Sequence, residues 1–127
     1  MSEAEEPRVV TVGRGRRDYV PGVSLEWLAD ENLTPGSGMT FGRAQFEPGS
    51  SNPEHYHPNC HELVFVAEGT IEHTIGTQTV TLSAGSLLHV PQGVRHRAIN
   101  VGEDTATLLV AFSSEARQTV FLDEPAE

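Results

Sequence analysis

The sequence predicts an all-β sandwich or barrel, and three observations support this. Turn-forming residues recur about every eight to twelve positions. Between them, short runs alternate apolar and polar residues, as strands with one buried face do. No window keeps a helical period for more than about two turns, so we expect at most one short helix, over 114–120.

The 127 residues are enough for one domain with a single core. We expect one β domain over 9–122, between an acidic flexible tail at 1–8 and another at 123–127. The expected strands are 9–12, 23–28, 40–46, 62–67, 71–75, 79–82, 87–90, 95–100 and 105–112.

Turn signals separate these strands. Residues 35–38 and 47–53 are rich in Gly, Pro and Ser, and Gly76-Thr77 has the length of a two-residue hairpin turn. Pro91 ends the strand before it, because proline lacks the donor that a central strand needs. Small all-β domains often cover exposed strand edges by dimerising. We therefore expect a homodimer, with the β-branched run at 9–12 pairing with a partner's sheet.

Composition excludes several classes of chemistry. The chain has no lysine, so Schiff-base enzymes and lysine-dependent phosphate loops are ruled out. Its one cysteine, Cys60, excludes an intrachain disulfide and a Cys-rich zinc site. The net charge of −10 disfavours nucleic-acid binding, and we interpret the basic cluster at 14–17 as a solvated loop. The polar N-terminus and short apolar runs indicate a cytoplasmic protein with no membrane contact.

All six histidines lie between His55 and His96. His55 and His57 are two residues apart, so on an extended strand both imidazoles point to one face. Glu62 opens an apolar run and shares the parity of the inward-facing valines at 64 and 66. A buried carboxylate needs a charged or hydrogen-bonded partner, and a metal cation would serve. His96, after the turn at 91–93, is the candidate fourth ligand. On spacing alone, surface histidines remain an equal alternative.

Two motifs in the same region resemble those of the cupin family. Gly49-x5-His55-x-His57-x4-Glu62-x6-Gly69 is similar to the first cupin motif, and Gly85-x5-Pro91-x-Gly93-x2-His96-x3-Asn100 is similar to the second. Both are complete, and the segment 70–84 between them has the length seen in small single-domain cupins. Together they cover about 40% of the chain.

The resemblance implies a double-stranded β-helix, the jelly-roll barrel of cupins. It also implies one divalent metal per chain held by His55, His57, Glu62 and His96. The first three would come from adjacent strands and His96 from across the mouth. Three imidazoles and one carboxylate suit Fe²⁺, Mn²⁺, Ni²⁺, Zn²⁺ or Cu²⁺.

Similar cupins include dioxygenases, isomerases, lyases and polyketide cyclases. We expect a metal-dependent enzyme whose small oxygenated substrate binds directly to the metal. A dioxygenase, an oxidoreductase, is slightly favoured, because a chain without lysine has fewer general bases. The alternatives are an isomerase, lyase or polyketide-type cyclase, and a non-catalytic protein that binds a metal or a small ligand.

Three further residues are candidates for catalysis. His73 lies between two isoleucines on the apolar parity, so it is either an interior histidine or a substrate contact. His89 and Arg95 lie near Pro91, where either could act as an acid, a base or an anion contact. We expect His61 to face solvent or lie in a loop. Cys60 is either a small buried thiol or a reactive one.

Overall fold

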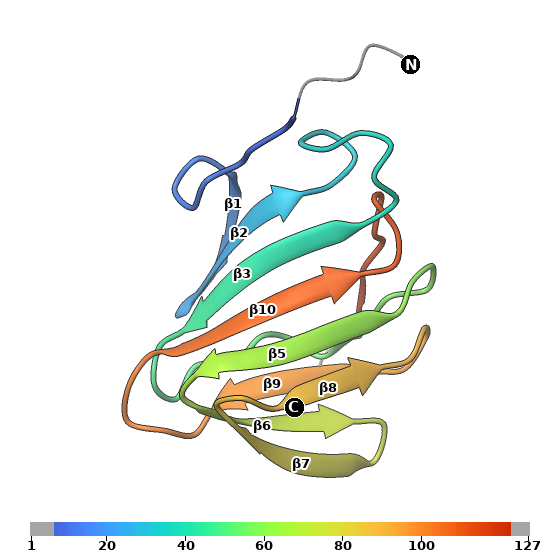
Figure 1. The fold of residues 1–127 in the computed structure, drawn as a ribbon. Helices are drawn as coiled ribbons and strands as arrows, with labels where there is room; N and C mark the ends of the chain where they lie inside the picture. Colours follow the sequence, from blue (N-terminus) through green and yellow to red (C-terminus); the bar gives the residue numbers. More distant parts are fainter. Residues whose placement is uncertain (1–6, 123–127) are drawn as a thin grey trace.

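Two antiparallel sheets face each other in the computed structural model, which describes residues 7–122. The strands are β1 (Arg16–Val20), β2 (Val23–Ala29), β3 (Thr40–Phe46), β4 (His55–Tyr56), β5 (Glu62–Glu68), β6 (Thr70–Ile75), β7 (Gln78–Ser83), β8 (Leu87–Val90), β9 (His96–Asn100), β10 (Ala106–Phe112) and β11 (Val120–Phe121). The six-stranded sheet has the order β1-β2-β3-β10-β5-β8 and the five-stranded sheet β11-β4-β9-β6-β7. In Figure 1, β1, β2, β3, β10 and β5 follow one another down the picture, and β6, β7 and β9 gather at its lower end.

This architecture confirms the all-β jelly-roll prediction. The described residues contain no helix, and so none with the length and apolarity needed to cross a membrane. Consecutive strands alternate between the sheets where the chain turns sharply. Gly69, between β5 and β6, has a φ of 92° that L side chains rarely adopt, and a Cβ there would collide with Ala106. The predicted hairpin turn at Gly76-Thr77 joins β6 to β7.

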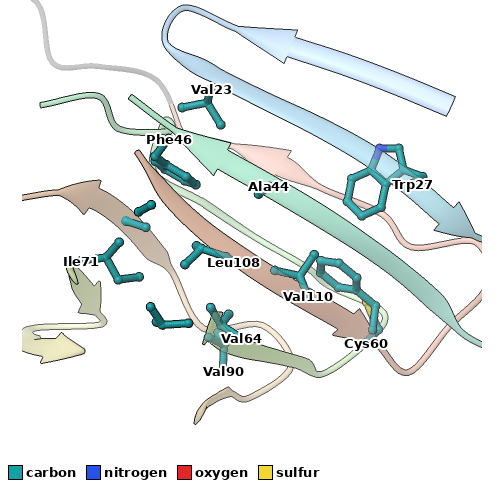
Figure 2. Close-up of a cluster of buried hydrophobic side chains, with 14 residues drawn as sticks. Val23, Trp27, Ala44, Phe46, Cys60, Val64, Ile71, Val90, Leu108 and Val110 are labelled. Atoms are coloured by element: carbon teal, nitrogen blue, oxygen red, sulfur yellow. The ribbon is translucent and has the colours of Figure 1, made fainter. Parts of the chain in front are cut away.

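The core lies between the sheets and is built from the inward-facing residues of each strand. On β5, Glu62, Val64 and Val66 are buried and their neighbours face outward or are half-buried, as the parity argument predicts. Figure 2 shows Trp27 towards one end of the buried cluster and Ile71 towards the other, with Leu108 and Val110 of β10 between them. The cluster thus spans the interior from β2 to β6.

Two predicted elements are wrong. Residues 9–12 form no strand, and a turn closes there through a hydrogen bond from Arg14 N to Thr11 O. The first strand is instead Arg16–Val20, which begins within the cluster at 14–17 interpreted as a solvated loop. Its arginines are exposed, but it pairs with β2. The short helix over 114–120 is also absent, and a turn and an extended stretch replace it.

The tails at 1–8 and 123–127 fall almost wholly outside the described residues. The homodimer and the cytoplasmic location stay predictions. Residues 9–12 form no strand, so β1 is the strand at this edge of the six-stranded sheet.

Candidate metal centre and its cavity

Four predicted ligands meet between the two sheets. The side chains of His55, His57, Glu62 and His96 are buried, and their ligand atoms all lie within 4.8 Å of one another. Glu62 begins β5 in the six-stranded sheet, whereas the histidines belong to the five-stranded sheet or the loop beside it. The structure therefore brings together all four residues that the motifs indicate.

The arrangement of the ligands differs from the expectation in one respect. His55 and His96 are direct neighbours in the pairing of β4 with β9, so His96 does not reach across the mouth. The carboxylate of Glu62 is the group that comes from the opposite sheet. Pairing between strands about 40 residues apart depends on the register of the whole sheet, so the motif spacing could not reveal it.

Backbone carbonyls fix the orientation of all three imidazoles. Nδ1 lies 2.7 Å from Pro53 O in His55, 2.9 Å from Gln118 O in His57 and 3.1 Å from Val94 O in His96. Because a carbonyl oxygen only accepts hydrogen bonds, each Nδ1 carries the proton. Each Nε2 is then left with a lone pair, the state required of a metal ligand.

The Nε2 atoms and the carboxylate lack hydrogen-bond partners. Nε2 of His57 and of His96 lie 3.3 and 3.0 Å from Oε1 of Glu62. These contacts do not have hydrogen-bond geometry, and within residues 7–122 the three atoms are buried without a partner. Buried polar atoms are rarely left unsatisfied. Lone pairs and a carboxylate oxygen that face one point fit a divalent cation.

Electrostatics favour the ionised carboxylate of Glu62 and the neutral ring of His55, but not the neutral ring of His96. Burial opposes the ionisation of Glu62, but the facing imidazoles of His57 and His96 outweigh it and lower its pKa to about 2. Burial lowers the pKa of His55 to about 4. Burial also disfavours charge on His96, but the Glu62 carboxylate more than offsets this and raises its pKa. The carboxylate is ionised near neutral pH, as a metal ligand must be.

The cluster forms part of the wall of a cavity of about 310 Å³. The cavity is mostly apolar, and β2, β3 and β10 contribute Leu25, Ala44, Phe46, Leu108 and Val110 to it. It also receives a few polar groups, among them Asp18, His73 and Arg117. An apolar cavity with few convergent polar groups is typical of small-molecule sites.

The other histidines separate into two groups. His73 is buried in the cavity wall, with its ring stacked on that of His96 at a centroid distance of 5.5 Å. Neither of its ring nitrogens has a partner among the described residues, and burial lowers its pKa to about 4. His61 and His89 are exposed and face each other outside the cavity, with Nδ1 3.1 Å from Nε2.

Of the three candidates for catalysis, the structure brings only His73 to the metal cluster. His89 does not line the cavity, and Arg95 is exposed, with Nε 4.0 Å from Glu54. No observation tests a catalytic role for any of the three, so these roles stay predictions. Cys60 is almost fully buried, and burial raises the pKa of its thiol.

Sequence reasoning missed the contribution of the segment after β10 to this site. This segment supplies the carbonyl of Gln118 and the hydroxyl of Thr119, which lies 3.2 Å from His57 Nδ1. It also brings Arg117 into the cavity. We expected a helix over 114–120, and neither motif includes these residues, so the sequence did not indicate that they belong to the site.

Known proteins share this fold. The family described as "Cupin domain" matches residues 42–112, more than half of the chain. The chain is a cupin. A germin-like protein 5-1 from Oryza sativa subsp. japonica is 35% identical to it over 101 residues, which cover 76% of this cupin but only 44% of the rice protein.

Two other comparisons cover more of the matched protein. The polyketide synthase CurC of Streptomyces cyaneus is 34% identical to this cupin over 107 residues, 84% of this chain and 70% of that one. A solved oxalate oxidase superposes with a TM-score of 0.81 at 27% identity, over 96% of this cupin and 67% of the oxidase. This cupin is therefore similar both to an oxalate oxidase and to a polyketide synthase protein.

Proposed function

We propose that this cupin is a metal-dependent enzyme that oxidises a small oxygenated organic molecule with O₂, as a dioxygenase. The observation that carries the proposal is the convergence of three imidazole Nε2 atoms and one carboxylate on the wall of an apolar cavity. A structural metal site would be closed on all sides, whereas a catalytic site keeps positions open. The cavity beside the cluster supports the catalytic reading.

A bound divalent metal would supply Lewis acidity and coordination positions for O₂ and for a chelating substrate. The residues of the chain have separate tasks. Backbone carbonyls hold the imidazole rings so that each Nε2 stays unprotonated, and the two sheets keep bulk water from the cluster. His73 presents a neutral, unpartnered ring to the cavity, where it can exchange a hydrogen bond or a proton with the substrate.

The similarity to a solved oxalate oxidase, which covers almost the whole chain in structure, supports a reaction with O₂. An oxidase does not place the oxygen atoms of O₂ in its organic product, so the dioxygenase is favoured on separate grounds. A dioxygenase reaction needs no separate reductant, because both oxygen atoms enter the product and the substrate supplies all the electrons. A chain without lysine relies correspondingly more on its metal.

The ligand set is tested by elemental analysis of purified variants. His55→Ala and His96→Ala are each expected to lose stoichiometric divalent metal, because three protein ligands remain and one buried position is opened. His61→Ala is the matched control, since His61 is exposed and outside the cluster, and it should keep the metal. Full metal content in either ligand variant would overturn the proposed site.

The reaction class is tested by oxygen uptake. The Fe²⁺-loaded protein is mixed with a panel of 1,3-diketones and catechols in an oxygen-electrode cell. Uptake with at least one compound, together with a product that carries ¹⁸O from ¹⁸O₂, is the expected result. No uptake with any member would reject the dioxygenase proposal for these substrate classes.

A metal-dependent isomerase, lyase or polyketide-type cyclase is the second candidate. The similarity to CurC, which covers most of both chains, favours it. These reactions move protons and carbon bonds without net oxidation, so the zinc-loaded protein should turn over substrate under anaerobic conditions. The dioxygenase would be silent in that assay, which separates the two candidates.

A further inference from the structure

Arg117 enters the cavity from the segment after β10 and lies against two aromatic rings. Its guanidinium carbon is 4.3 Å from the ring centroid of Trp27 and 5.1 Å from that of Phe112. The two rings are 6.0 Å apart and inclined by 60°, so the guanidinium contacts both without being sandwiched between them. Cation–π contacts of this kind hold the charged group in place. Within residues 7–122 the side chain donates one hydrogen bond, from Nη1, so most of its five N–H donors remain available.

The charge of Arg117 lacks a close counterion. Its Nη1 donates a hydrogen bond to Thr119 Oγ1. No carboxylate lies within 4.0 Å of it among residues 7–122, whereas Arg16 and Arg17 both meet acidic groups. Burial lowers the pKa of Arg117, and the carboxylates of Glu62 and Asp18 favour its charge only from a longer range. A half-buried guanidinium with unused donors is suited to an incoming anion.

Arg117 and the metal cluster line the same cavity. Thr119 Oγ1 accepts a hydrogen bond from Arg117 and lies 3.2 Å from Nδ1 of the ligand His57. The ring of Phe112 contacts Arg117 and His57, with its centroid 4.9 Å from that of the His57 imidazole. Because the guanidinium and the metal cluster share a cavity of about 310 Å³, a single small molecule can reach from one to the other.

Charge and shape describe the rest of the ligand. The chain has a net charge of −10. A divalent metal and Arg117 would nevertheless outweigh the two carboxylates that line this cavity, Glu62 and Asp18, and make it locally positive. The remaining wall is apolar, and about 310 Å³ lies within the range of pockets for organic ligands. A two-carbon diacid has no apolar body to place against that wall.

We propose that Arg117 is the specificity-determining residue of this site and binds the carboxylate of an organic acid whose other oxygen atoms chelate the metal. The apolar body of the acid lies against the sheet formed by β2, β3 and β10. This assignment rests on the proposed function, because it takes the metal centre as the place where the substrate reacts.

The test measures binding to the zinc-loaded full chain by isothermal titration calorimetry, so that no turnover is involved. Two pairs of probes share a chelating end and differ in the charge of the other end. They are 3,4-dihydroxybenzoate with 3,4-dihydroxybenzamide, and 2,4-dioxopentanoate with its methyl ester. Trp27 is the only tryptophan, so its emission, corrected for absorption by the probe, reports whether the probe sits beside Arg117.

In at least one pair, the wild-type protein is expected to bind the acid about 10- to 100-fold more tightly than its neutral partner, as a charge-assisted contact implies. Arg117→Met keeps the apolar stem over Trp27 and should abolish this ratio. Arg117→Lys keeps the charge and should restore part of it. Arg14→Met, which removes an exposed arginine outside the cavity, should leave the ratio unchanged.

Two results would overturn the assignment. One is a wild-type protein that prefers neither acid. The other is a preference for the acid that persists in Arg117→Met. That result is expected if Arg117 has only a structural role, because its loss would then weaken the binding of the acid and of the neutral probe equally. If Arg117→Met holds less zinc than the wild type, Arg117→Gln is measured in its place. If the acid-to-neutral affinity ratio depends on Arg117 but no oxygen is taken up, the dioxygenase proposal is refuted and the role of Arg117 is retained. If oxygen is taken up but the ratio is absent, the dioxygenase proposal is retained and the role of Arg117 is refuted.

Discussion

Protonation of His73 should destabilise the metal-free protein in mildly acidic solution. Burial lowers its pKa from 6.5 to about 4, so the folded state favours the neutral ring. As the pH falls from about 6.5 towards 4, the unfolded chain takes up a proton that the folded chain refuses. The stability contributed by the neutral ring is therefore complete above pH 6.5 and is lost as the pH falls through this window.

The size of the effect follows from the two pKa values. Between about pH 7.5 and pH 5, the linkage relation gives a loss of about 2 kcal/mol for one histidine shifted in this way. His73→Phe keeps an aromatic ring beside His96 and cannot be protonated. Its free energy of unfolding should fall by about 2 kcal/mol less than that of the wild-type protein over the same pH interval, even though His55 titrates in both.

The assay is urea denaturation of the EDTA-treated full chain at the two pH values, followed by circular dichroism. Ile71→Val is the matched control, because Ile71 is buried on the same strand and carries no proton. It should cost about 1 kcal/mol at both pH values and leave the interval unchanged. If His73→Phe lost as much stability as the wild-type protein, the inferred neutral state of His73 would be refuted.

Three further substitutions test the supports of the site. Asn100→Ala removes hydrogen bonds to three backbone groups from a buried side chain and should lower the free energy of unfolding by about 2–4 kcal/mol in urea; a loss under 1 kcal/mol would contradict this. Gly42→Ala places a Cβ on the ring of Trp27 and should cost about 1–3 kcal/mol with a changed near-ultraviolet spectrum, whereas an unchanged melting temperature would argue against that overlap. Thr119→Val removes the hydroxyl beside His57 and should weaken metal affinity about tenfold in a chelator competition, and wild-type affinity would show that the hydroxyl is dispensable.

The sequence was most informative where the chemistry depends on local spacing. The parity of Glu62 with the valines that follow it placed the carboxylate inside the barrel, and the two motifs selected the four ligands. Both inferences need only the alternation of a strand and the order of residues along the chain. The pairing of β4 with β9, which places His55 beside His96, depends on contacts far apart in sequence, and no local pattern encodes it.

The wrong strand at 9–12 and the missed strand β1 show that strand formation depends on a tertiary partner as well as on local propensity. The run at 9–12 is β-branched but meets no neighbouring strand. In contrast, β1 pairs with β2 although its arginines are exposed, and the ion pairs of Arg16 with Asp30 and of Arg17 with Glu26 accompany that pairing. Exposed charged residues on an edge strand resemble a loop when their partners are unknown.

The absence of the helix over 114–120 explains how the site acquires its shape. The carbonyls of Ser114, Ala116 and Gln118 accept hydrogen bonds from Thr40, Asn59 and His57 respectively, all outside the segment.

A helix over 114–120 would use the carbonyls of Ser114 and Ala116 within its own turns, so the tertiary bonds to these two carbonyls and the helix exclude each other. Held extended, the segment orients one metal ligand through Gln118 and places Arg117 over Trp27. The same backbone therefore orients a metal ligand and presents the guanidinium, so substitutions that loosen this segment should weaken metal binding and acid selectivity together.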